Sequence, residues 1–235
     1  MSVVLEKQRK VLRFKDAVLT TDPYARTVSE ALNLEVCAGE LFLIRLGRSD
    51  QIASFADVCN GTIHPLSGSI FFLGKDWRYL SPDVANALRG RTGHVFFTGN
   101  WTQSLSVVEN ILTPQLYHTR NSRAQLLDQA GHLAESFGLP GLPGGLPGDF
   151  TAADLQRAAC VRAFLGRPLL VLLQEPTRGL EPDILEPLIQ AIREARYRGA
   201  AVIWLTKEKE IWKDATIPTT QRYHLVARNL MEEKL

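Results

Sequence analysis

A glutamate that follows a buried strand is the strongest candidate for chemistry in this sequence. Leu169 to Leu173 form a continuous apolar run that is too short for a helix and typical of a parallel strand covered on both faces. Gln174, Glu175 and Pro176 follow directly. Because open α/β sheets bind their ligands at the carboxyl ends of the strands, Glu175 is predicted to lie at the ligand-binding edge of the sheet.

A second stretch lies where a phosphate-binding loop would follow an earlier buried strand, 41–44. Such a loop needs glycines whose backbone N–H groups surround the phosphates, a lysine that reaches the β- and γ-phosphates, and a Ser or Thr for magnesium. The stretch 46–54 reads LGRSDQIAS and contains no lysine. Ser49 and Ser54 supply its only hydroxyl groups, so they are its candidate ligands for a nucleotide.

The chain length suits one large α/β domain or two small lobes. The chain has 235 residues, 45% of them hydrophobic, and a net charge of +2, which gives no case for nucleic-acid binding. The three cysteines form no CxxC pair and lie in apolar context, so we expect reduced core residues of a cytosolic protein: Cys37, Cys59 and Cys160. We expect no signal peptide and no membrane span, because no stretch of about 18 apolar residues is present.

Alternating and helical patterns predict the elements that would position these residues. Period-two patterning predicts N-terminal strands at 11–14 and 32–36, separated by a turn at Asp22-Pro23. Helical spacing and capping signals predict helices at 81–90, 121–137 and 181–198, and a Gly/Pro-rich stretch at 138–148 predicts a loop. Further strands are expected at 70–73 and 200–206, and a final strand pair within 222–230.

The order of short motifs resembles that of the ABC-transporter ATPases. Gly39-Glu40, Pro65-x-Ser67-Gly68, Val107-x-Glu109-Asn110 and Gln156-Arg157 precede EPTRGLEP at 175–182. The resemblance covers about residues 10–232 and implies an α/β fold: a P-loop NTPase-like, mostly parallel sheet with an N-terminal antiparallel β lobe and a helical subdomain. It implies a single domain over 1–235, with a RecA-like core and β lobe at about 1–95 and 155–235 and the helical subdomain at about 98–154.

Aligned on this resemblance, the phosphate loop has lost its working residues. The first and last family glycines fall on Leu46 and Gln51, the lysine on Ile52 and the magnesium-binding hydroxyl on Ala53. The family stacks an aromatic side chain on adenine, and Tyr24 is the closest match, at a spacing about one residue short. An exposed loop tyrosine is the alternative interpretation of Tyr24.

The other motifs are altered as well. Glu175 matches the family's catalytic glutamate, and a structural role in binding loop amides is its alternative. Phe97 stands at the Q-loop glutamine, where a core or interface aromatic is the alternative, and Gln174 stands at the Walker B aspartate. Lys207 replaces the switch histidine, unless it only begins a solvated helix. In the signature motif, Thr151 keeps a hydroxyl, alanines replace the glycines, and Asp154 replaces the glutamine.

One branch of the family is most similar. The residues Thr98-Gly99, Leu105-Ser106-Val107 and Glu109-Asn110 resemble the Mla-type ATPases, as do Leu80-Ser81 and Ala87-Leu88-Arg89. That branch belongs to transporters that move phospholipids with MCE-domain proteins. The resemblance therefore implies lipid transport and a possible MCE-domain lipid-transfer partner.

Three hypotheses follow for the function. The first is a degenerate ATPase subunit, peripheral on the cytoplasmic, inner face of the cell membrane, that binds transmembrane permease subunits and pairs with an ATPase subunit or with itself. The family resemblance alone suggests ATP and Mg²⁺ as cofactors. We expect no tightly bound cofactor and no binding of nucleic acid. The second is an active ATPase that uses substitute residues such as Arg45, Arg48 or Lys207. The third, a Rossmann-like binding module, needs a glycine fingerprint that the sequence lacks.

Overall fold

The computed structural model describes residues 9–22, 27–179, 182–226 and 229–233. Its central sheet has the strand order β12-β11-β5-β10-β9-β8, in which all neighbours are parallel except the β11–β12 pair. The strands are β5 (Leu41–Arg45), β8 (Thr92–Val95), β9 (Leu170–Gln174), β10 (Ala201–Thr206), β11 (Gln221–Val226) and β12 (Asn229–Glu232). The predicted mostly parallel sheet of a P-loop NTPase-like fold is confirmed.

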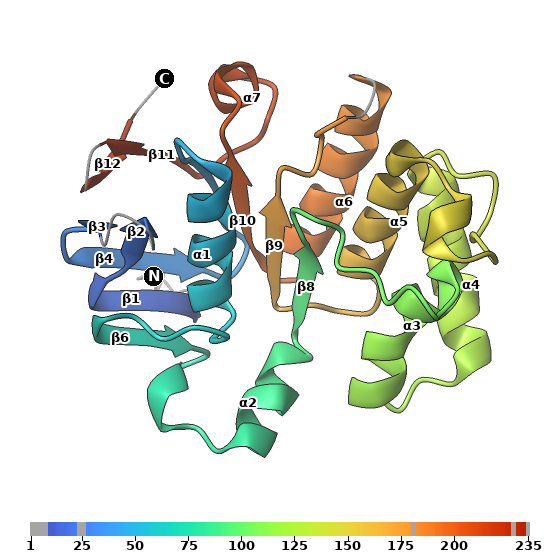
Figure 1. The fold of residues 1–235 in the computed structure, drawn as a ribbon, viewed down its shortest axis with the longest axis horizontal. Helices are drawn as coiled ribbons and strands as arrows, with labels where there is room; N and C mark the ends of the chain where they lie inside the picture. The colour runs from blue at the N-terminus through green and yellow to red at the C-terminus, as the bar shows by residue number, and fades with distance from the viewer. Residues whose placement is uncertain (1–8, 23–26, 180–181, 227–228, 234–235) are drawn as a thin grey trace, which may run out of the picture.

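The predicted N-terminal antiparallel lobe is also confirmed. A second sheet has the order β4-β1-β6-β7 and lies to the left of the central sheet in Figure 1. Its strands are β1 (Lys10–Val18), β4 (Leu32–Cys37), β6 (Ser67–Phe72) and β7 (Lys75–Asp76). A short antiparallel pair, β2 (Thr20–Asp22) and β3 (Thr27–Val28), lies beside it.

Helices cover both faces of the central sheet. Figure 1 shows α1 on the side of the β lobe, α5 and α6 on the opposite side, and α3 and α4 beyond α5. The α-helices are α1 (Ser49–Cys59), α2 (Pro82–Arg89), α3 (Val107–His118), α4 (Arg123–Ser136), α5 (Ala152–Phe164), α6 (Leu185–Tyr197) and α7 (Lys209–Lys213). The 3₁₀ helices are η1 (Trp77–Tyr79), η2 (Pro147–Asp149) and η3 (Pro182–Ile184).

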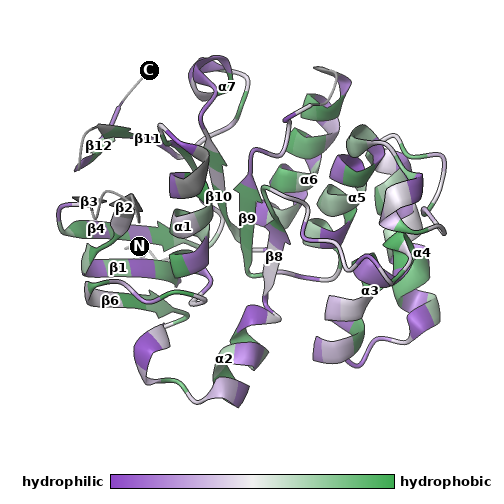
Figure 2. Cartoon of the chain, in the orientation of Figure 1, coloured by the Kyte–Doolittle hydropathy of each residue, from purple (hydrophilic) through white to green (hydrophobic). Residues whose placement is uncertain are grey.

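Two apolar cores lie on the two faces of the central sheet. Leu41 and Leu43 of β5 pack with α5 and α6, whereas Phe42 and Ile44 pack with α1 and the β lobe. The central strands are therefore hydrophobic along their length, as Figure 2 shows in green. This double coverage explains why the sequence of β9 is a continuous apolar run instead of an alternating one.

Local signals set several of the element boundaries. Ser122 caps α4 with a capping box to Gln125, and Pro82 occupies the first turn of α2. The helix expected over 181–198 is divided, because η3 precedes α6. Gly93 permits β8 to approach α5, since a Cβ there would lie 1.8 Å from the backbone oxygen of Ala163. No helix within the described ranges combines the length and the apolar character that a membrane span requires.

Candidate functional site

The link between β5 and α1 is too short to surround a phosphate chain. Because α1 begins at Ser49, only the residues 46–48 join the strand to the helix. The positions that the resemblance assigns to the second half of the loop are helical, and the amide of Ile52 donates to the backbone oxygen of Arg48 at 3.2 Å. The amide at the position assigned to the lysine is therefore bonded within the helix and is not free for a phosphate.

Backbone amides of this link donate hydrogen bonds to other groups of the chain. The amide of Leu46 donates to the backbone oxygen of Thr206 at 2.9 Å, and the amide of Gly47 donates to the Oε1 atom of Gln51 at 3.1 Å. Leu46 is 1% exposed and Ile52 is fully buried, both in the core between the β lobe and the sheet. The position assigned to a phosphate-binding lysine is therefore part of the hydrophobic core.

Of the remaining candidates near this link, the structure describes only the side chain of Ser54. Ser54 lies on α1, and its hydroxyl donates to the backbone oxygen of Thr20 at 3.4 Å. Ser49 begins α1, but its side chain lies outside what the structure describes. Tyr24, the predicted adenine-stacking residue, also lies outside the described residues.

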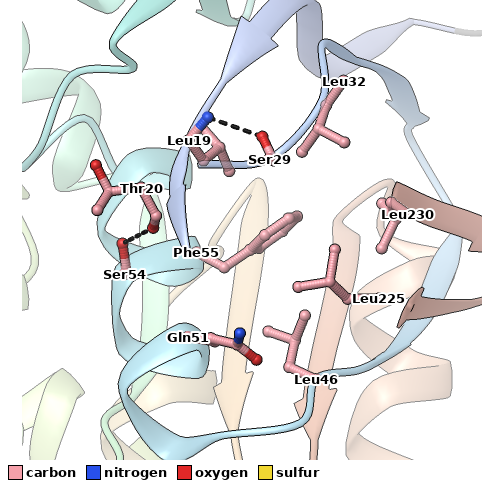
Figure 3. Close-up of a pocket in the computed structure, with 10 residues that line it drawn as sticks. All are labelled: Leu19, Thr20, Ser29, Leu32, Leu46, Gln51, Ser54, Phe55, Leu225 and Leu230. Carbon is pink, nitrogen blue, oxygen red and sulfur yellow. Dashed lines mark hydrogen bonds between the residues drawn. The ribbon is translucent and has the colours of Figure 1, made fainter. Parts of the chain in front are cut away.

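A small apolar cavity separates α1 from the β lobe and the C-terminal strands (Figure 3). It leaves about 20 Å³ for the centre of a water molecule, which is space for roughly one water. Its lining residues are Leu19, Thr20, Ser29, Leu32, Leu46, Gln51, Ser54, Phe55, Leu225 and Leu230. Apolar side chains thus fill the space beside the predicted phosphate loop.

Gln174 connects the end of β9 to the loop after β8. Its Oε1 atom accepts a hydrogen bond from the amide of Phe97 at 2.6 Å. The guanidinium of Arg178 lies 4.2 Å from the centre of the Phe97 ring, which is the geometry of a cation–π contact. The two residues at the predicted Walker B and Q-loop positions therefore bind each other. Gln174 offers a neutral amide oxygen that is already engaged, in place of the carboxylate of the family.

The carboxylate of Glu175 is directed at the end of β10. Its Oε2 atom accepts from the Thr206 hydroxyl at 2.8 Å, and its Oε1 atom accepts from the amide of Lys207 at 2.7 Å. Glu175 is 1% exposed, and burial raises its pKa while these two hydrogen bonds oppose the rise. This geometry fits the structural alternative, in which the glutamate binds loop amides. Lys207 contributes its backbone, and the residue is exposed.

The substitution Glu175→Gln is expected to lower stability. Glutamine offers its oxygen to the amide of Lys207 and its NH₂ group to the hydroxyl of Thr206, so two hydrogen bonds to a carboxylate become weaker, neutral ones. We expect the free energy of unfolding to fall by about 1–3 kcal/mol in urea titrations. The matched control, Glu210→Gln at an exposed position of α7, should leave it unchanged. Full stability of Glu175→Gln would contradict the structural role.

The N-terminus of α5 is capped from within the chain. The Thr151 hydroxyl accepts from the amide of Asp154 at 3.1 Å and donates to the Oδ2 atom of Asp154 at 2.7 Å. A carboxylate in the first turn of a helix interacts favourably with the helix dipole. The side chain of Asp154 thus supplies an anion at the helix end that the resemblance assigns to a partner's γ-phosphate.

Sequence reasoning missed Arg162, which holds the loop after β8. Its guanidinium lies 4.4 Å from the ring centre of Trp101 and 5.5 Å from that of Phe96, and it donates to the backbone oxygens of Gly99 and Asn100. Burial lowers its pKa to about 10, so it remains charged at neutral pH. The signal in the sequence was an arginine within the otherwise apolar buried run of α5.

Gln156, also on α5, fixes the loop after β9. Its side-chain amide donates to the backbone oxygens of Glu175 at 3.4 Å and Pro176 at 3.1 Å. In the sequence this residue served only as a motif marker. The fold therefore brings four of these groups to one edge of the sheet: Glu175, Gln174, Phe97 and the backbone of Lys207. The described contacts of Thr151 and Ser54 lie elsewhere.

Within the described residues, no group of three or more His, Cys, Asp or Glu side chains could hold a metal ion.

Sequence comparison finds relatives among ABC transporter proteins, although no family model matches the chain. It is 25% identical over 208 residues to the macrolide export ATP-binding/permease protein MacB of Rhodopirellula baltica, covering 87% of this chain and 30% of that protein. It is 26% identical over 200 residues to the octopine permease ATP-binding protein P of Rhizobium meliloti, covering 80% and 76%. It is 30% identical over 184 residues to the methionine import ATP-binding protein MetN of Rhizobium etli, covering 77% and 50%.

Structural comparison shows the fold. The dimeric structure of MJ0796, described as a bacterial ABC transporter cassette, matches with a TM-score of 0.82 at 19% identity and covers 95% of this chain and 98% of that one. A structure of the ATP-binding subunit of an ABC transporter matches with a TM-score of 0.81 at 21% identity, covering 96% and 90%. The sequence relatives therefore support one family, the ATP-binding domains of ABC transporters, and the structural neighbours show that this chain has the cassette fold.

Proposed function

We propose that this chain is an ABC transporter subunit that keeps the cassette fold but neither binds nor hydrolyses ATP effectively. The observation that carries the proposal is the link between β5 and α1, in which Ile52 is buried in the core and the Gly47 amide is bound by Gln51. A phosphate loop needs a cation and free amides at these positions.

Two further positions support the proposal. Gln174 and Phe97 bind each other, so neither presents a ligand for magnesium. The hydroxyl of Thr151 is bound to Asp154, whose negative charge repels phosphate. The polar groups at these positions are therefore hydrogen-bonded within the chain and need no nucleotide to satisfy them.

The chain then acts through its surfaces. We propose that it binds transmembrane permease subunits from the cytoplasmic face and pairs with an ATPase subunit or with a second copy of itself. We also propose that residues at about 98–154 form a helical subdomain and that the RecA-like core lies on both sides of it in the sequence. For the transported substrate we propose phospholipid, together with an MCE-domain partner, on the strength of the stretch 98–110. The relatives described above are named for macrolide, octopine and methionine transport.

Titration of the purified chain with Mg-ATP, followed by thermal unfolding, tests the loss of nucleotide binding. A ligand at about 100 times its dissociation constant stabilises a protein by roughly 2.7 kcal/mol, which is a visible shift. We expect no shift in the melting temperature at millimolar Mg-ATP. A magnesium-dependent shift would overturn the proposal.

The second candidate function is an active ATPase with substitute residues. The observation that favours it is the position of Lys207. This residue is exposed, directly follows β10, and donates its backbone amide to the carboxylate of Glu175. Arg45 is less suited, because its Nη1 atom lies 3.2 Å from the Nε2 atom of His224. If Mg-ATP does stabilise the chain and Lys207→Ala abolishes that stabilisation, this candidate replaces the first.

A further inference from the structure

A large cleft lined by arginines lies away from the Glu175 edge of the sheet. We call it the arginine cleft. Arg91 directly precedes β8 and Arg167 lies shortly before β9, so the cleft is at the amino ends of these strands, whereas Glu175 follows the carboxyl end of β9. Its volume is about 860 Å³. The cationic or titratable basic side chains that line it are Arg91, Arg120, Arg167, Arg198, His118 and His132.

The cleft carries an excess of positive charge. Arg91, Arg120 and Arg167 form no ion pair and no side-chain hydrogen bond with any described residue. Glu194 is the only carboxylate among the described lining residues, and it is paired with Arg198 at 3.8 Å. The carboxyl ends of α2, α3, α5 and α6 lie at the cleft, and the dipole of each helix contributes about half a negative charge there. Their sum of about two negative charges is smaller than the three positive charges of the unpaired arginines.

The size and lining of the cleft fit a protein segment. A volume of this order accommodates a ligand far larger than a phosphate ion. Leu133, which is half-buried, is an apolar lining residue that a partner can contact, whereas Phe164 is 3% exposed and belongs to the core. A second hollow of about 540 Å³ shares Glu194 and Arg198 with the cleft and adds Tyr197, which is 94% exposed. The site is therefore continued along the outer surface of α6.

The residue types favour a protein partner over a membrane surface. Protein interfaces are enriched in arginine and tyrosine and depleted in lysine, and no lysine is among the described lining residues of either hollow. Tyr117, which is 77% exposed, lies edge-on to His118 at 4.8 Å and adds an aromatic group beside the cleft. A concave site also admits a protruding segment more readily than a flat bilayer.

We propose that the arginine cleft binds an acidic segment of a partner protein, with carboxylates at the unpaired arginines and an apolar side chain against Leu133. The proposal deepens the proposed function and rests on it in one respect: a subunit without nucleotide chemistry must act through a binding surface. It identifies the partner's segment by its chemistry, as amphipathic and rich in Glu or Asp.

The test measures binding of a fluorescent, Glu-rich amphipathic peptide by anisotropy at low and at physiological salt. Arg120→Gln/Arg167→Gln should weaken binding by about tenfold or more, because two unpaired charges are removed from the contact. The matched control, Lys15→Gln/Lys75→Gln, removes the same charge from exposed positions of the β lobe and should bind as the wild type does. Thermal unfolding of both variants verifies that they are folded.

Three outcomes would overturn the proposal. The first is no peptide binding by the wild-type chain, and the second is equal loss of binding in the cleft variant and in the control. The third is tighter, Arg120- and Arg167-dependent binding of inorganic phosphate or of vesicles containing anionic phospholipid. The Mg-ATP titration is independent of all three, so a chain that binds both ATP and the peptide would retain the cleft and refute only the loss of nucleotide binding.

Discussion

Restoring the family's lysine through Ile52→Lys should destabilise the fold strongly and should not create ATP binding. Ile52 is fully buried in an apolar core beside Leu46 and Phe55, so an ammonium group there loses its hydration without gaining a carboxylate partner in that apolar cluster. Buried unpaired charges cost several kcal/mol, and the packing of the isoleucine is lost as well. We expect the free energy of unfolding to fall by about 4 kcal/mol or more in urea titrations.

The control for this substitution is Ile52→Val, which removes one methylene and should cost about 0.5–1.5 kcal/mol. Nucleotide binding should stay absent in Ile52→Lys because the link is still residues 46–48 and the Gly47 amide is still bound by Gln51. If Ile52→Lys is as stable as the wild type and gains a magnesium-dependent shift with ATP, then the phosphate loop is intact and our account of this link is wrong.

Acid should destabilise the chain through His94. This side chain is buried against Phe96, with ring centres 3.8 Å apart, and neither ring nitrogen has a partner among the described residues. Burial, with a smaller contribution from Arg162, lowers the pKa of His94 from 6.5 to about 3. Because the folded-state pKa lies below the unfolded one, the stabilisation is present above about pH 6.5 and is lost as the pH falls toward 3.

The expected slope is about 1.4 kcal/mol for each pH unit below 6.5, measured by urea titrations at several pH values. His94→Phe keeps an aromatic ring against Phe96 but cannot be protonated, so the difference in stability between variant and wild type should change by this slope. His132→Gln, at an exposed position, should follow the wild-type curve. Parallel curves for His94→Phe and the wild type would show that protonation of His94 does not control acid stability.

Several replaced motif residues share one structural property. Groups that a nucleotide or magnesium would contact in the family are replaced here by groups that bind within the chain: Gln51 to Gly47, Gln174 to Phe97, and Asp154 to Thr151. The Arg162 contacts with Trp101, Gly99 and Asn100 add rigidity to the loop after β8. A single reversion to the family residue is therefore expected to break a contact within the chain without restoring nucleotide binding.

The fold class and the identities of the replaced residues could be predicted from the sequence alone. An apolar run such as 169–173 can be recognised locally, because a strand covered on both faces must be hydrophobic along its length. The β-lobe strands were predicted from alternation, and α4 from its apolar spacing, since periods of two and 3.6 residues are visible without tertiary information. The motif order then placed Ile52, Phe97 and Gln174 at the family's working positions.

The contacts of those residues, in contrast, depend on the tertiary structure. The bond from Phe97 to Gln174 joins residues 77 positions apart, and the bond from Thr206 to Glu175 spans 31, so no local pattern could reveal either. The early start of α1 at Ser49, the role of Arg162 and the arginine cleft also depend on distant contacts. Local periodicity records which face of an element is buried, whereas the partner of a polar group is set by the packing of the whole chain.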